Sequence, residues 1–212
     1  MESARLRAIA FKIGVTMTQK FKILVVAILA TLSVAALAVA QTPGEQVRET
    51  IKRVTGIVGA SAAGESERRD ALKRLILPRF DWNEMARLAL GKHWPATPAR
   101  QHEFVVTFTE FIGNAYLGQI GAYHDEKILY LGERRENNRA QVDTKLQPAS
   151  GDPLTVNYML HHVEGEWKIY DVVIADISLV NNYRAQFNRI LTKGSLEDLL
   201  RQLKEKESKD RG

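Results

Sequence analysis

The stretch LTVNYMLHHVEGEWKIYDVVIA, residues 154–175, decides the fold class. Strand-forming residues lie on both sides of Glu164-Gly165, which predicts two antiparallel strands joined by a two-residue turn. With that turn, the pairs expected on one face are Leu160 with Ile169, Tyr158 with Asp171 and Val156 with Val173. Apolar residues occur on both faces, so we expect either that both are covered or that one lines a cavity.

Two further strands are predicted just before this hairpin, because the spacing of apolar residues changes to a period of two from Lys127 onward. The four predicted strands are Lys127–Leu131, Arg139–Leu146, Leu154–Val163 and Glu166–Ala175. Short connections between successive strands favour an antiparallel meander.

Helices are predicted on both sides of the sheet in the sequence. Asp81 and Glu84 have the spacing of a helix cap and its partner, and Gly91 stands where that helix would end. Thr97-Pro98 begins a long helix that carries an apolar stripe at intervals of three and four residues. After the sheet, a helix containing Tyr183 and Phe187 ends near Gly194, and Ser195 with Asp198 caps a last helix.

This order predicts an α+β fold in which helices pack on a curved four-stranded antiparallel sheet, like the cone of NTF2-like proteins, and enclose an apolar pocket. The face assignments make the following residues its expected lining: Phe104, Phe108, Phe111, Ile112, Val142, Val156, Tyr158, Leu160, Ile169 and Val173. The phenylalanines have a second interpretation as ordinary core, because a core and a pocket wall use the same residue types.

Residues 1–40 read as a signal peptide. Lys20 and Lys22 precede the apolar run Ile23–Ala38, and Ala38-Val39-Ala40 has the small residues that signal peptidase requires. Residues 1–16 add nothing to such a signal, which leaves Met1 and Met17 as alternative starts. An uncleaved membrane anchor is the alternative, for which about 20 apolar residues would be typical.

Residues 41–212 are expected to form a single domain that frays from about residue 204. Residues 1–40 hold four of the five net positive charges, so this domain is nearly neutral. A nearly neutral domain without a basic stripe argues against nucleic-acid binding. The chain has no cysteine, which is compatible with export because a domain of this length can bury a core without disulfides.

The sequence contains no recognisable catalytic or cofactor-binding motif. There is no thiol, no nucleophile elbow and no glycine-rich phosphate loop. His161 and His162 are adjacent on a strand and point to opposite faces, so no metal site is predicted. Asp171 is the one carboxylate within an apolar strand. It is expected to be a structural acid held by Tyr158, an arginine such as Arg184, or backbone amides; the alternative is a general base in a small isomerase or hydratase.

Several segments together resemble the MlaC family, also called the toluene-tolerance auxiliary proteins. They occur in the family's order from about Pro43 to Lys206, and each is loose by itself. The segments are Phe80-Asp81, Met85-Ala86, Leu90-Gly91-Lys92-His93-Trp94, Thr97-Pro98, Arg100-Gln101, the phenylalanines 104, 108 and 111, Trp167-Lys168, Tyr170-Asp171, Ile177-Ser178-Leu179-Val180, Asn182-Tyr183-Arg184 and Gln186-Phe187.

The resemblance implies a monomeric periplasmic carrier that binds phospholipid and needs no cofactor. It implies two partners, an outer-membrane lipoprotein/porin complex and an inner-membrane ABC transporter complex, and a role in keeping phospholipid out of the outer leaflet. A periplasmic adaptor with a solid core that binds no ligand remains a further alternative.

Overall fold

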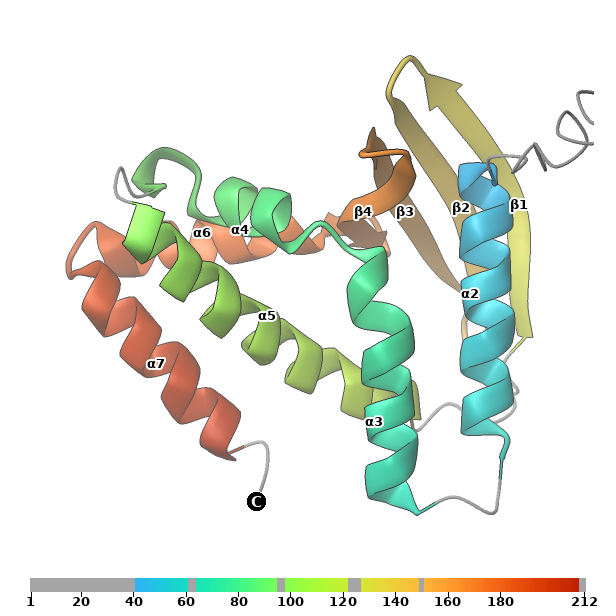
Figure 1. The fold of residues 1–212 in the computed structure, drawn as a ribbon, viewed down its shortest axis with the longest axis horizontal. Coiled ribbons are helices and arrows are strands. Elements are labelled where there is room, and N and C mark those ends of the chain that lie inside the picture. Colours follow the sequence, from blue (N-terminus) through green and yellow to red (C-terminus); the bar gives the residue numbers. More distant parts are fainter. Residues whose placement is uncertain (1–40, 61–63, 95–97, 122–126, 149–150, 210–212) are drawn as a thin grey trace, which may run out of the picture. The chain divides into compact units, whose positions relative to one another are not determined.

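The computed structural model describes residues 41–60, 64–94, 98–121, 127–148 and 151–209. The expected signal peptide and the expected cap at Thr97 lie outside these residues. The described residues all belong to one compact unit, Gln41–Gly212. In it the helices are grouped at one side and along one face of the sheet (Figure 1).

The sheet is an antiparallel meander with the strand order β1-β2-β3-β4-β5. Its strands are β1 (Lys127–Glu136), β2 (Arg139–Gln147), β3 (Leu154–Val163), β4 (Glu166–Ile174) and β5 (Ile177–Ser178). The predicted class and meander are confirmed, and the two-residue β5 is an additional strand. Bulges interrupt the register within β1 and between β3 and β4, and bulges bend the strands that contain them.

The register of the central hairpin was predicted correctly only next to its turn. Leu160 pairs with Ile169 as expected, but beyond a bulge at Tyr170 the partner of Tyr158 is Val172 and the partner of Val156 is Ile174. The bulge moves Asp171 and Val173 to the opposite face. A regular register would have placed the Asp171 carboxylate on the apolar face, where burying an unpaired charge is strongly unfavourable.

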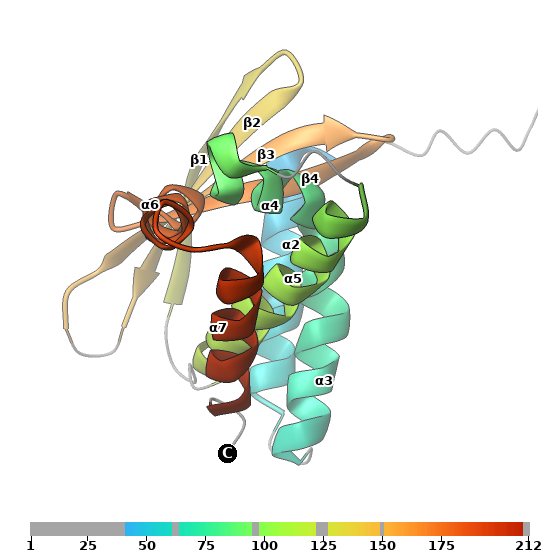
Figure 2. The ribbon, with the colours of Figure 1, turned by 90° about the vertical axis from the view of Figure 1, so that its left-hand side faces the viewer.

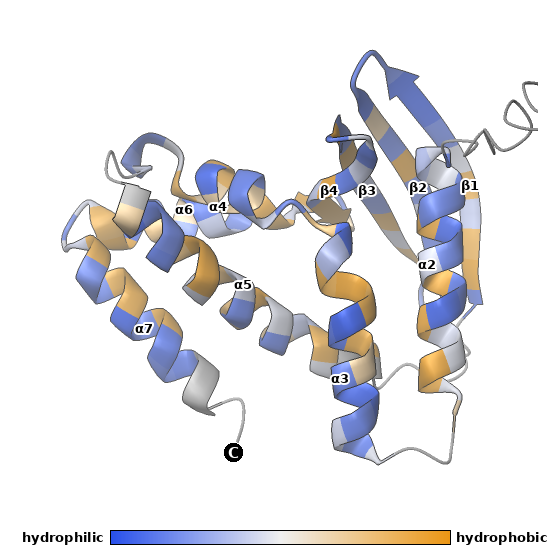
Figure 3. Ribbon diagram, in the orientation of Figure 1, coloured by the Kyte–Doolittle hydropathy of each residue, from blue (hydrophilic) through white to orange (hydrophobic). Residues whose placement is uncertain are grey.

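Six α-helices and two short 3₁₀ helices surround this sheet within the described residues. They are α2 (Pro43–Val58), α3 (Glu65–Ile76), η1 (Leu77–Arg79), α4 (Trp82–Leu90), η2 (Gly91–His93), α5 (Pro98–Gly121), α6 (Leu179–Leu191) and α7 (Leu196–Lys209). The views in Figures 1 and 2 show α2 and α3 side by side and α7 running along α5. Apolar residues recur along α2, α3 and α5 (Figure 3).

Helix boundaries follow the capping signals. Asp81 Oδ1 accepts a hydrogen bond from Glu84 N at 2.9 Å, and the helix ends at Gly91, whose φ of +52° favours glycine. Ser195 and Asp198 cap each other reciprocally, with Asp198 N donating to Ser195 Oγ and Ser195 N to Asp198 Oδ2. Both predicted caps are therefore confirmed.

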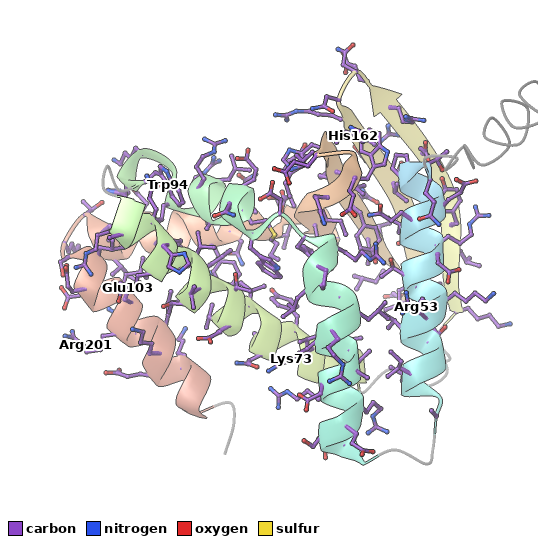
Figure 4. All side chains as sticks on the ribbon, viewed as in Figure 1. Arg53, Lys73, Trp94, Glu103, His162 and Arg201 are labelled. Atoms are coloured by element: carbon purple, nitrogen blue, oxygen red, sulfur yellow. The ribbon has the colours of Figure 1, made fainter. Side chains whose placement is uncertain are left out.

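Two main hydrophobic clusters result from this arrangement. The larger joins α4, α5, α6 and α7 and contains the stacked rings of Phe104 and Phe108 with Phe187 across them. The second joins α2 to the sheet through Val47, Val142 and Leu160. On the outer side of the first cluster, α5 and α7 bound a shallow charged groove with Glu103 on one helix and Arg201 on the other (Figure 4).

Candidate functional site

An apolar cavity of about 380 Å³ lies between the sheet, the helices α2 and α5, and the segment from Ile76 to Trp82. Its volume is within the range of about 300–1,000 Å³ that is typical of small-molecule pockets. Helix α2 contributes Val47, Ile51, Val54 and Val58; α5 contributes Ile112, Leu117 and Ile120; and the sheet contributes Ile128, Leu146, Leu154, Val156, Ile169, Val172 and Ile174.

Two contacts fix the direction in which α2 crosses this cavity. Gly44 N donates to Glu133 Oε2 at 2.7 Å, and the Arg48 guanidinium lies 4.3 Å from the centre of the Tyr130 ring. Helix α2 therefore runs antiparallel to β1, from Gln46 at one end of the cavity to Val58 at the other. These 12 helical steps span about 18 Å.

The uncharged polar side chains that line the cavity bond to the protein itself. Gln46 Nε2 donates to Trp167 O at 2.6 Å, Trp82 Nε1 to Leu77 O at 2.9 Å, and Thr144 Oγ1 to Val156 O at 2.7 Å. Thr50 and Thr55 each donate to a backbone carbonyl of α2. Because these donors are already satisfied, the uncharged part of the wall offers no free hydrogen-bond donor to a ligand.

Tyr158 is the lining residue whose protonation the cavity alters most. Burial raises the pKa of its hydroxyl to about 12, and a hydrogen bond with Thr144 opposes this only in part. The hydroxyl therefore stays neutral at physiological pH. A neutral hydroxyl that already bonds to Thr144 adds no charge to the cavity.

Four of the ten predicted lining residues contribute to the cavity wall: Ile112, Val156, Tyr158 and Ile169. The phenylalanines 104, 108 and 111 do not. Phe104 and Phe108 are completely buried between α4, α5, α6 and α7, so the core interpretation describes them correctly. Helix α5 has 24 residues, so its two halves can pack against different surfaces. Its N-terminal half packs in the helical core, and only its C-terminal half reaches the cavity.

The remaining three predicted lining residues are also placed elsewhere. Val142 and Leu160 are fully buried under α2, and neither reaches the cavity surface. Val173 faces away from the cavity because of the bulge at Tyr170.

Asp171 is held at the start of α6, on the face of the sheet opposite to the cavity. Its Oδ1 accepts hydrogen bonds from Val172 N at 2.9 Å and Val180 N at 3.0 Å, and Ser178 Oγ donates to its Oδ2 at 2.5 Å. Of the three expected kinds of partner, the backbone amides are the ones observed. Arg184 packs over Gly91 instead. A general base at Asp171 would have no access to a ligand in the cavity.

The α2 wall was missed by the sequence reasoning, although the signal was present. Val47, Ile51, Val54 and Val58 are spaced by four, three and four residues, which is the period of an apolar helix face. The pattern shows that a face is apolar but not which surface it covers.

This architecture matches that of a known protein family. The model of the MlaC protein family matches residues 46–205, about three quarters of the chain. The chain belongs to the MlaC family. The resemblance seen in the sequence is therefore confirmed, and the matched region includes every element from α2 to α7 except their outermost residues.

Two relatives of the MlaC family with established names are similar over about two thirds of the chain. The intermembrane phospholipid transport system binding protein MlaC of Haemophilus influenzae is 26% identical over 146 residues, covering 66% of this chain and 68% of that protein. The toluene tolerance protein ttg2D of Pseudomonas putida is 27% identical over 159 residues, covering 70% and 72%.

A solved structure shares the MlaC fold of this chain. It is the phospholipid-binding protein from Ralstonia solanacearum in complex with a phospholipid, with a TM-score of 0.73 and 21% identity, covering 81% of this chain and all of that one. At this identity the likeness establishes the fold. In the described part of this chain, no helix has the length and apolar character needed to cross a membrane.

Proposed function

We propose that this MlaC-family chain is a periplasmic carrier that holds the acyl chains of a phospholipid in the cavity between α2, α5 and the sheet. The observation that carries the proposal is an apolar volume of about 380 Å³ whose uncharged polar lining groups already bond to the protein. Membership in the MlaC family and the names of the relatives from Haemophilus influenzae and Pseudomonas putida support it.

The physical need for such a carrier is large. A two-chain phospholipid has on the order of 30 methylenes, and at about 0.8 kcal/mol each its tails would cost roughly 24 kcal/mol to expose to water. Free diffusion between two membranes is negligible at that cost. A protein cavity and a bilayer bury the tails to a similar extent, so loading and unloading need little net free energy.

Direction then has to come from the docking partners. The proposed partners are an outer-membrane lipoprotein/porin complex and an inner-membrane ABC transporter, whose ATP hydrolysis can drive the cycle. In this role a single copy of the chain shuttles one cargo, helps keep phospholipid out of the outer leaflet and needs no covalent chemistry. Localisation in the periplasm follows from the expected signal peptide and from the proposed partners.

Native mass spectrometry of the purified mature chain tests the proposal directly. We expect a mass increment of a phospholipid in protein from a Gram-negative host. Val156→Glu places a carboxylate on the cavity wall and should empty it, because ionised groups are excluded from hydrocarbon surroundings. Val106→Glu is the matched control, since Val106 is 43% exposed on α5 and outside the cavity lining.

A lipid-free mass for the unmodified protein from several hosts would refute the carrier function. Equal lipid content in Val156→Glu and Val106→Glu would place the lipid somewhere other than this cavity. Circular dichroism of both variants checks that they are folded before their lipid contents are compared.

A further inference from the structure

Arg79 is the one charged side chain among the described residues that line the cavity. Its Nε is closed off from solvent, and within the part of the chain that the structure describes this atom has no hydrogen-bond partner and Arg79 forms no ion pair. The uncharged polar groups of the cavity have their bonds within the protein, whereas this donor has none. Arg79 is therefore the one positive charge that the described lining offers to a ligand in the cavity.

A second cation lies close to Arg79. Pro78 directly precedes Arg79, and its carbonyl oxygen accepts a hydrogen bond from Lys168 Nζ at 2.9 Å. Lys168 is therefore a second cation beside η1. Glu166 forms an ion pair with Lys168 at 2.6 Å. The hydrogen bond from Lys168 is the main cause that lowers the pKa of Glu166, and the charge of Arg79 contributes less. Arg79, Lys168 and Glu166 together carry one net positive charge.

The cavity is charged at the Arg79 end and mostly apolar at the other. Near Arg79 the wall includes Gln46 of α2, which donates to Trp167 O, next to Lys168. The opposite end includes Val58, Ile120, Ile128, Leu146 and Leu154, with Thr55 one turn before Val58. The paired positions Ile128, Leu146 and Leu154 on β1, β2 and β3 fix that apolar end in the sheet.

We infer that the Arg79 guanidinium binds the phosphate of the carried phospholipid, and that the acyl chains run from η1 toward Leu146 and Leu154. This rests on the proposed carrier function and specifies how the cargo is oriented. A guanidinium suits the role because its N–H groups match phosphate oxygens in pairs. The aliphatic part of the same side chain can line the cavity beside the glycerol region.

A pair of substitutions separates this role from a general loss of a buried arginine. Arg79→Gln removes the charge at the cavity. Arg69→Gln is the matched control, because Arg69 Nε is also buried without a partner but the residue bonds to Asn114 and lies outside the cavity lining. The probes are co-purified phospholipid observed by ³¹P NMR and transfer of that lipid to phosphatidylcholine vesicles.

We expect Arg79→Gln to move the ³¹P resonance of the bound lipid and to speed its loss to vesicles about tenfold or more. Arg69→Gln should change neither. If wild-type protein carries no phospholipid, the carrier function itself fails. If wild type is loaded but Arg79→Gln matches it in resonance and rate, or if Arg69→Gln has the same effects, the carrier function stands and the assignment of Arg79 is wrong.

Two further measurements test the source of the phosphate and the orientation. Delipidated protein mixed with inorganic phosphate should show no Arg79-dependent ³¹P shift, and tight binding of free phosphate would overturn the lipid assignment. In protein with Trp94→Phe and Trp167→Phe, Trp82 at the η1 end should be quenched more by phosphatidylcholine spin-labelled at acyl carbon 5 than at carbon 16. The reverse order would refute the proposed direction of the tails.

Discussion

Substitution of Asp171 distinguishes a structural acid from a catalytic one. The side chain is only 9% exposed and links three groups at the junction of β4, β5 and α6. Its carboxylate accepts hydrogen bonds from Val172 N, Val180 N and Ser178 Oγ. Asp171→Ala removes all three acceptor interactions at once.

The expected loss of stability follows from these contacts. Both amides belong to buried residues, and each buried N–H left without an acceptor costs about 1–3 kcal/mol, while the Ser178 hydroxyl can rotate toward another acceptor. We therefore expect Asp171→Ala to lower the free energy of unfolding by about 3–5 kcal/mol. Asp171→Asn keeps one oxygen acceptor for the two amides and should lose about 1–2 kcal/mol.

Urea unfolding followed by circular dichroism measures the change, with Asp143→Ala as control. Asp143 is on β2, on the same face as Asp171, and pairs with Arg134, whose side chain is 70% exposed. An exposed ion pair contributes about 1 kcal/mol or less. The reasoning is refuted if Asp171→Ala is no less stable than Asp143→Ala, or if folded Asp171→Asn loses its lipid.

Two further predictions concern the core and the cavity. Phe108→Ala should lower the free energy of unfolding by about 3–5 kcal/mol, because Phe108 is fully buried in the helical core. Since Phe108 lies away from the cavity, native mass spectrometry should show an unchanged lipid content per folded molecule. Lipid loss without destabilisation would contradict this prediction. Burial raises the pKa of Tyr158 from its usual value near 10 to about 12, so its contribution to stability is complete below pH 10 and is lost as the pH rises from about 10 to about 12. Urea midpoints across that window should fall with pH, and Tyr158→Phe should fall less steeply; identical slopes would show that Tyr158 is not buried as described.

Local chemistry in the sequence determined the four main strands of this fold and several of its helix ends. The alternation on both sides of Glu164-Gly165 predicted the hairpin, and Asp81, Gly91 and Ser195 marked helix ends because caps act through neighbouring backbone groups. These interactions span only a few residues, so they can be recognised without knowing the rest of the chain. The family could be recognised as well, because its motifs recur in order.

Tertiary packing decided which apolar face meets which partner. The stripe containing Phe108 and the stripe containing Ile51 both require burial, but the hydrophobic effect has no direction and does not select a partner. Only the fold directs the first into the helical core and the second onto the cavity.

The bulge at Tyr170 was likewise outside the reach of a local rule. One extra residue reverses the facing of every later residue in β4, so Val172 and Ile174 line the cavity while Asp171 reaches the start of α6. The sequence by itself determined that this hairpin exists. Two requirements of the assembled structure decided its register. A carboxylate has to stay out of hydrocarbon surroundings, and Asp171 has to accept the amide of Val180 in the first turn of α6.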